Sequence, residues 1–166
     1  MQSITKKIES ITPRNLHYCD VGARWGIDQP WKTFRDVIDL ISFEPDKEEY
    51  DSLMKKKYSK DMIYPYVLAN EPKTLSFNLT KVRGDSSLYK PNFEFLKNYP
   101  DVDRFQIEET VTIEATSIDT LYSDNVFSNI DFIKMDVQGA ELDILTGGEK
   151  FLSENNPSTS LVVGGR

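Results

Sequence analysis

The sequence contains few of the residues on which metal and redox chemistry depend. Among 166 residues there is a single cysteine, Cys19, and a single histidine, His17. One cysteine excludes an internal disulfide and every multi-cysteine metal site. Its neighbours in the sequence favour a core strand position over a catalytic thiol. No hydrophobic run is long enough to cross a membrane, and the first residues lack the apolar segment of a signal peptide, so we expect a cytoplasmic protein.

Positive charge is also scarce. The chain has 20 Lys and Arg against 27 Asp and Glu, a net charge of −7. Because sequence-independent binding of nucleic acids requires a basic surface, we expect no nucleic-acid partner. The basic run 55–57 with Lys60 is typical of the C-terminal end of a helix. The hydrophobic fraction of 39% is ordinary for a folded chain, and the length fits one core.

Hydrophobic periodicity predicts helices that alternate with short strands. Helical spacing is found at 3–11, at 30–38, after Asp46, after Thr116 or Ser117, and from about Ala140 to 155 with an interruption near Gly147. In the helix after Asp46, Asp46 has capping-box spacing to Glu49, and Tyr50, Leu53 and Met54 form an apolar stripe. Apolar runs predict strands at 16–21, 40–43, 63–68, 74–79, 111–115, 132–135 and from 160. Such alternation predicts an α/β fold, with a mostly parallel sheet and helices on both faces. We expect a leading helix within 1–15 and one domain over 16–166.

The residues that follow the first three predicted strands form a candidate nucleoside pocket. Gly22 lets the backbone leave the first strand sharply and approach a ligand. Asp20 can accept a hydrogen bond from an ammonium group. Glu44 can accept from two ribose hydroxyls, and the amide of Asn70 can read an adenine edge. Taken alone, Gly22 also fits an ordinary turn, Glu44 an exposed acid and Asn70 a loop residue. Their shared position at the carboxyl edge favours the interpretation as a nucleoside pocket.

The glycine spacing differs from that of a dinucleotide-binding fingerprint. Gly22 and Gly26 are separated by three residues, and Arg24 stands where the second glycine of G-x-G-x-x-G belongs. This difference argues against a nucleotide-dependent oxidoreductase.

Four segments together resemble the FkbM family of methyltransferases. They are 20–26, 43–46, 84–88 and, above all, 131–142, which reads DFIKMDVQGAEL. The resemblance covers about 16–155 and implies a Rossmann-like class I methyltransferase sheet, S-adenosylmethionine as cofactor, and O-methylation of a hydroxyl on a sugar or other small-molecule acceptor. In this sequence Gln138 stands where many members have glutamate.

The resemblance also places functional residues. It implies Asp20, Gly22 and Gly26 at the methionine end of the cofactor, Glu44 at the ribose, and Asp136 beside the cofactor or the acceptor. With the two turns that carry these residues, the predicted cofactor-binding set is Asp20, Gly22, Ala23, Arg24, Gly26, Glu44, Pro45, Asn70 and Asp136.

A hydroxyl acceptor needs a base within hydrogen-bond reach. His17 is excluded, because it lies at the start of the first strand, roughly 15 Å from the carboxyl edge at about 3.3 Å per residue. The base is therefore predicted to be a carboxylate, with Asp136 first and Glu141 second. Glu141 also fits a first-turn helix residue that interacts with the helix dipole. The acids are too few to predict a metal site.

The family pattern continues beyond Arg166 with further helix and strand. We therefore expect a C-terminally truncated domain in which the final strands are missing, with an open sheet edge that favours self-association. The alternative function is then a catalytically inactive or truncated module that binds S-adenosylmethionine.

Overall fold

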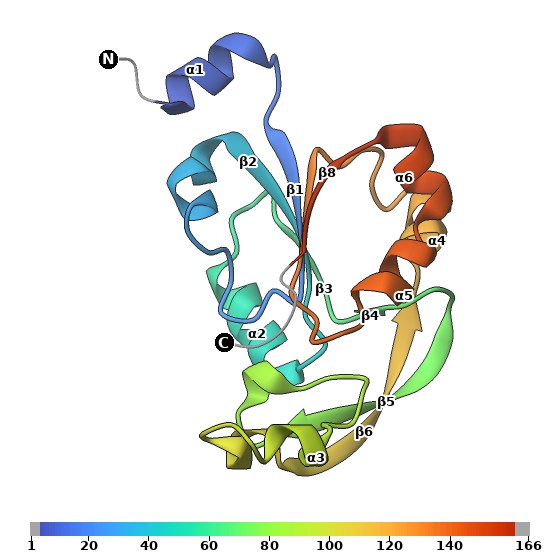
Figure 1. Cartoon of the computed structure of the whole chain (residues 1–166). Helices are drawn as coiled ribbons and strands as arrows, with labels where there is room; N and C mark the ends of the chain where they lie inside the picture. The colour runs from blue at the N-terminus through green and yellow to red at the C-terminus, as the bar shows by residue number, and fades with distance from the viewer. Residues whose placement is uncertain (1–3, 162–166) are drawn as a thin grey trace.

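The chain folds around a parallel sheet that has five strands in residues 4–161, the range described by a computed structural model (Figure 1). In spatial order the strands are β3 (Met62–Tyr64), β2 (Ile38–Phe43), β1 (Leu16–Val21), β7 (Phe132–Met135) and β8 (Ser158–Leu161). The chain runs outward from β1 in one direction through β2 and β3, and β7 and β8 lie on the other side. This order confirms the predicted α/β fold and creates a topological switch point at the carboxyl ends of β1 and β7, where open sheets bind ligands.

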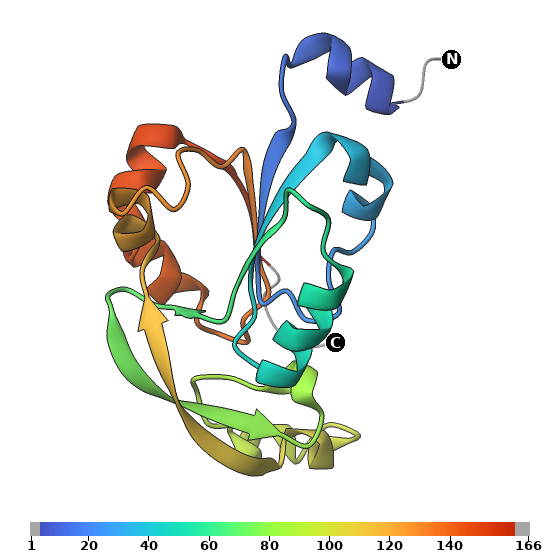
Figure 2. The same ribbon diagram turned by 180° about the vertical axis from the view of Figure 1, so that it is seen from behind.

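Helices cover both faces of this sheet (Figures 1 and 2). The 3₁₀ helix η1 (Trp31–Val37) and α2 (Lys47–Lys56) lie on one face, and α4 (Ile118–Ser123), α5 (Glu141–Thr146) and α6 (Glu149–Asn155) lie on the other. The leading helix α1 (Ile4–Ile11) lies beside η1.

Alternating side chains of β1 divide the core between the two faces. Tyr18 packs against Trp31 of η1, with ring centroids 4.5 Å apart. Cys19 points the other way, into the main cluster with Ile118 and Phe151. Burial raises the pKa of the Cys19 thiol, which agrees with the core position predicted for it.

A second sheet lies beyond the carboxyl ends of the five strands (Figure 1). Within the described range it consists of β4 (Val67–Leu68), β6 (Ile107–Thr116) and β5 (Lys73–Thr80), in that order, with β5 and β6 antiparallel. The connection from β5 to β6 carries three short helices, η2 (Arg83–Asp85), α3 (Phe93–Leu96) and η3 (Val102–Phe105). The sequence predicted these strands but did not predict that they form a sheet of their own.

Two predicted elements differ from the structure. The strand predicted over 63–68 is two strands, because β3 ends at Tyr64 and β4 starts at Val67 in the other sheet. Pro65, which has no N–H to donate to a ladder, lies between them. The helix predicted over 30–38 is a 3₁₀ helix that ends at Val37, and Ile38 is already in β2.

Smaller differences concern the apolar stripe of α2, the start of β8 and the cap of α4. Met54, predicted in the apolar stripe of α2, is exposed, whereas Leu53 is buried. The last predicted strand begins at Ser158, two residues early, and Val162 and Val163 lie outside the described residues. Ser117 is the residue that caps α4, through a 3.1 Å bond from the Thr120 amide. The division into 1–15 and 16–166 and the self-association through a sheet edge stay predictions.

Candidate active site

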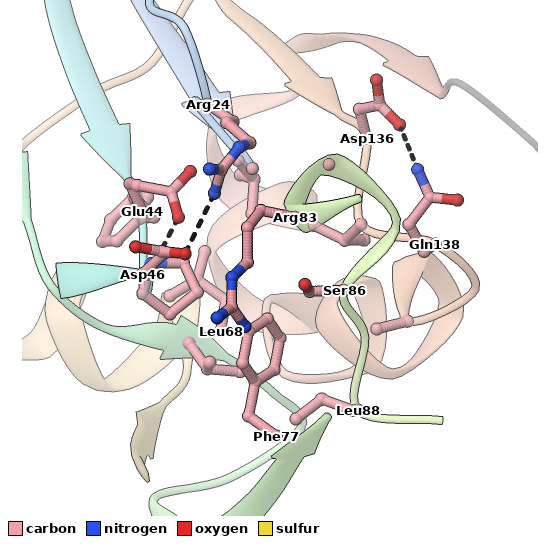
Figure 3. Close-up of a pocket in the computed structure, with 18 of the residues that line it drawn as sticks. Arg24, Glu44, Asp46, Leu68, Phe77, Arg83, Ser86, Leu88, Asp136 and Gln138 are labelled. Carbon is pink, nitrogen blue, oxygen red and sulfur yellow. Dashed lines mark hydrogen bonds and ion pairs between the residues drawn. The ribbon is translucent and has the colours of Figure 1, made fainter. Parts of the chain in front are cut away.

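A cavity lies between the carboxyl ends of β1, β2 and β7 and the second sheet (Figure 3). The five-stranded sheet and its loops contribute Gly22, Arg24, Glu44, Pro45, Asp46, Lys134 and Asp136 to its lining. The second sheet and its connection contribute Leu68, Phe77, Arg83, Gly84, Asp85, Ser86, Leu88 and Arg104. The cavity therefore has a charged side at the switch point, formed by the five-stranded sheet and its loops. The opposite side, formed by the second sheet and its connection and called the roof below, carries both arginine and apolar side chains.

Gly22 brings backbone close to the cavity. Its φ of 78° lies in the left-handed region that favours glycine, and a Cβ there would overlap the carbonyl oxygen of Asp136. The amides of Gly22 and Ala23 both donate to the carbonyl of Phe43, at 3.1 and 3.2 Å, which fixes the turn against β2. Ala23 is buried beneath the turn, and neither it nor Gly26 is among the residues that line the cavity.

Asp20 pairs with an ammonium group of the chain itself, that of Lys134. Lys134 lies opposite Asp20 in the parallel register of β1 and β7, and its Nζ is 3.0 Å from Asp20 Oδ1. Burial raises the pKa of Asp20 to about 6, although Lys134 opposes the rise. Asp20 is 2% exposed and is not among the lining residues, whereas Lys134 is. Asp20 therefore orients Lys134 beneath the turn.

Glu44 directly follows β2 and is a buried carboxyl that faces the cavity. Only 4% of the residue is exposed, and its Oε1 accepts a 2.9 Å hydrogen bond from the amide of Asp46. Burial raises the pKa of Glu44 to about 7, against the lowering effects of that hydrogen bond and of Arg24. A carboxyl so placed has acceptor capacity left for further hydroxyl donors.

Arg24 and Asp46 tie the first turn to α2. Arg24 Nη1 lies 3.1 Å from Asp46 Oδ2, while Asp46 Oδ1 caps α2 by accepting from the amides of Glu48 and Glu49. Burial acts to raise the pKa of Asp46, but the hydrogen bonds from Glu49 and Arg24 lower it below its ordinary value. The Glu49 carboxylate accepts from the Trp25 amide, so only half of the predicted capping box forms.

The structure does not bring Asn70 to the cavity. Asn70 is exposed, its amide N–H donates to Asp143 Oδ2 at 3.3 Å, and its side-chain oxygen accepts from Lys73. Leu68, two residues earlier, lines the cavity in its place. Asn70 lies beyond the end of β4, where its bonds to Asp143 of α5 and to Lys73 hold it outside the cavity.

The loop after β7 separates the two predicted acids. Asp136 lines the cavity, and its Oδ1 accepts from Gln138 Nε2 at 3.3 Å (Figure 3). Glu141 does not line it; its Oε1 accepts from the amides of Val137 and Gly139, each at 3.4 Å. Gln138 has a φ of 56° and Gly139 one of 104°, so Glu141 braces a tightly turned loop.

His17 lies away from the cavity. Its Nδ1 is 3.1 Å from the carbonyl oxygen of Asn129, and its Nε2 is 3.9 Å from Asp39 Oδ2. Among the residues that the structure describes, no group of three or more His, Cys, Asp or Glu could hold a metal ion. In the same part of the chain, no helix has the length and apolar character needed to span a bilayer.

The roof contains the residues that the sequence did not predict. Arg104 donates to both carboxylate oxygens of Asp85, at 2.6 and 3.2 Å, and Ser87 Oγ donates to the carbonyl of Gln138 at 3.0 Å. The segment 84–88 is one of the four motifs that resemble the family, and the resemblance implies no role for it. Its contact with the loop after β7 shows that it closes the cavity from above.

The family model described as "Methyltransferase FkbM domain" matches residues 20–163. The chain belongs to the FkbM methyltransferase family. The match covers all of the cavity-lining residues and confirms the resemblance carried by the four motifs.

A solved structure shows the same fold. The crystal structure of Methyltransferase FkbM from Methylobacillus flagellatus KT superposes with a TM-score of 0.53 at 16% sequence identity. The match covers 89% of this chain and 32% of that one, so the chain spans about a third of the length of that protein. No curated protein matches the sequence significantly.

Proposed function

We propose that this chain is an S-adenosylmethionine-dependent O-methyltransferase that acts on a hydroxyl group of a sugar or another small metabolite. The observation that carries the proposal is the convergence of Gly22, Glu44 and Asp136 on one cavity. Each residue directly follows one of three neighbouring strands at the switch point of the sheet, where α/β folds bind ligands.

The cavity fits an adenosyl group by the chemistry of its walls. Glu44 is a buried carboxyl with free acceptor capacity, which suits a pair of ribose hydroxyls. Leu68 and Phe77 offer an apolar surface for a purine ring. At Gly22 any side chain would overlap Asp136, so the backbone is bare where the rest of the ligand must pass.

S-adenosylmethionine, when bound, supplies an electrophilic methyl group on a sulfonium. Asp136 is the proposed base that takes the proton from the acceptor hydroxyl, because it is a carboxylate at the cavity wall. Gln138 orients it through the hydrogen bond to Oδ1. Lys134, held by Asp20, fixes the turn beneath the site through the carbonyl oxygen of Gly22, 3.5 Å from its Nζ. The remaining contribution of the chain to catalysis is to hold the methyl donor and the acceptor hydroxyl in the right orientation.

Binding of S-adenosylhomocysteine tests the cofactor part of this proposal. Calorimetry on the wild type, on Glu44→Gln and on the exposed control Glu48→Gln would measure the dissociation constant of each. Glutamine keeps an acceptor for the Asp46 amide but loses the charge. We expect about a tenfold to hundredfold weaker binding for Glu44→Gln, because hydrogen bonds to charged groups contribute about 1.5–3 kcal/mol, and no change for the control.

Transfer of labelled methyl from S-adenosylmethionine to a panel of hydroxylated sugars tests the reaction. An alkali-stable methyl ether on the product, lost in Asp136→Asn, is the expected result. Tight binding of S-adenosylhomocysteine without transfer to any acceptor would support the inactive module instead. Equal binding by the wild type and Glu44→Gln would reject the adenosyl pocket.

A further inference from the structure

The cavity is enriched in arginine. Three of the six arginines of this acidic chain line it, Arg24, Arg83 and Arg104, against one of the 14 lysines, Lys134. A guanidinium presents a planar fork of donors that matches carboxylate and phosphate groups, whereas an ammonium acts as a point charge. The enrichment therefore points to an oxyanion in the cavity, provided that the chain's own acids do not already satisfy these arginines.

Arg104 and Lys134 are satisfied within the chain. Arg104 is bound by both oxygens of Asp85, and Lys134 lies 3.0 Å from Asp20. These two cations shape the walls, and their charges are balanced by close carboxylates.

Arg83 is different. Its ion pair is with Glu108, at 3.8 Å between Nη2 and Oε2, which is too long for a hydrogen bond, and half of the Glu108 side chain is exposed. Within the described residues, Arg83 Nη1 is buried without a hydrogen-bond partner, and so is Arg24 Nε. A buried charged donor without an acceptor is unfavourable. Because Arg24 already pairs with Asp46 at 3.1 Å, Arg83 is the guanidinium with the larger unused capacity for an anion.

The backbone beneath Arg83 is held in place. The Asp85 amide donates to the carbonyl of Val82 at 2.8 Å, and Thr80 Oγ1 donates to the same oxygen at 2.8 Å. The ion pair of Asp85 with Arg104 fixes the other end of η2. Figure 3 shows the Arg83 side chain extending from this anchored turn towards Leu68 and Phe77, in the interior of the site. An anion would therefore meet a guanidinium that is already positioned.

We propose that Arg83 forms an oxyanion subsite and that the methyl acceptor is an acidic small molecule carrying a carboxylate or a phosphate group. This inference rests on the proposed methyltransferase function. The cofactor has a carboxylate of its own, but its methionine end is proposed at Gly22 and Asp136, whereas Arg83 enters from the roof and points away from Asp136 (Figure 3).

Inorganic phosphate is the probe for this subsite. It is titrated by calorimetry into the free chain and into the chain saturated with S-adenosylhomocysteine, for the wild type, Arg83→Gln, Arg83→Lys and the control Lys150→Gln on α6. We expect phosphate binding to weaken about tenfold or more in Arg83→Gln, because a charged hydrogen bond is lost. Arg83→Lys should recover part of the affinity, and the control should match the wild type.

Binding of the cofactor product separates the two sources of an oxyanion. Arg83→Gln should bind S-adenosylhomocysteine and 5′-methylthioadenosine, which lacks the carboxylate, as the wild type does. Weaker binding of S-adenosylhomocysteine alone would assign Arg83 to the cofactor and overturn the inference. Phosphate binding that is absent in the wild type, or unchanged in Arg83→Gln, would also overturn it. Failure of the wild type to bind S-adenosylhomocysteine would reject the methyltransferase proposal, and the phosphate titration of the free chain would still decide the role of Arg83.

Discussion

Replacing Glu44 with glutamine removes a buried carboxyl whose ionisation opposes folding and favours the proposed binding of ribose. Burial raises the pKa of Glu44 from its ordinary 4.5 to about 7. Between these two values the folded chain keeps a proton that the unfolded chain has released. Raising the pH through this range therefore destabilises the fold, and the loss is complete above pH 7.

The magnitude follows from the two pKa values. The full effect of the shift is about 3 kcal/mol at high pH, at 1.36 kcal/mol for each pKa unit. Between pH 6 and 8 the Glu44 carboxyl contributes about 1.4 kcal/mol of this loss. Burial also raises the pKa of Asp20, but only to about 6, so most of its effect lies below this window. Subtracting the Glu44→Gln variant from the wild type isolates the contribution of Glu44.

Ligand affinity should change in the opposite direction. Ribose hydroxyls donate to the ionised carboxylate, so the affinity for S-adenosylhomocysteine should rise about tenfold from pH 6 to pH 8 as Glu44 loses its proton. The same titration that destabilises the free protein thus improves the proposed site. Under the proposed function, ligand binding therefore offsets the cost that ionisation of this buried acid imposes on the fold.

Two measurements on the same samples check the reasoning. Urea unfolding at pH 6, 7 and 8 gives the free energy of unfolding, and calorimetry at the same pH values gives the dissociation constant. The Glu44→Gln variant should gain about 1.4 kcal/mol relative to the wild type across this range, and its affinity should change less with pH. A wild-type affinity that is flat or falls from pH 6 to 8 would refute the assignment of Glu44 to the ribose.

Three further substitutions have expected outcomes. Gly22→Ala should lower the free energy of unfolding by at least about 1–2 kcal/mol, the usual penalty for a left-handed residue with a side chain. It should also abolish binding of S-adenosylhomocysteine, because the added Cβ would overlap the Asp136 carbonyl oxygen and displace the turn. Thermal unfolding measures the first effect and calorimetry the second. Glu141→Gln should lower the transfer rate far less than Asp136→Asn in a labelled-methyl assay, because Glu141 braces a loop and does not line the cavity; equal losses would make it a catalytic residue. Ser117→Ala should destabilise the chain by about 1 kcal/mol, because the cap of the Thr120 amide is lost; urea unfolding measures it, and an unchanged midpoint would contradict the cap.

Strands with a clear apolar run could be predicted from the sequence alone. The ranges predicted for β1 and β7 coincide with the observed strands, because a short, mainly apolar segment between turns has few alternatives. The run over 63–68 is equally apolar, yet Pro65 divides it between two sheets. Sheet membership depends on long-range pairing, which neither alternation nor composition encodes.

The placement of site residues follows the same limit. Glu44 and Asp136 were predicted at the carboxyl edge and line the cavity, since each directly follows a strand of the parallel sheet. Asn70 was assigned to that edge by the same argument, but it follows β4, which belongs to the second sheet. Asp20 was predicted as an acceptor for a ligand, and the register that sets Lys134 opposite it is visible only in the folded sheet.

The two sheets divide the proposed functions in a way that bears on specificity. The carboxyl edge of the parallel sheet supplies Glu44 and Asp136, whereas the roof supplies Arg83 from a turn anchored by its own hydrogen bonds and ion pair. The roof meets the loop after β7 through Ser87 and the carbonyl of Gln138. Because Ser87 makes this contact, Arg83 can change without removing the hydrogen bond that reaches the loop of Asp136. Substitutions at Arg83 can therefore alter the proposed recognition of the acceptor while the residues proposed for the cofactor stay the same.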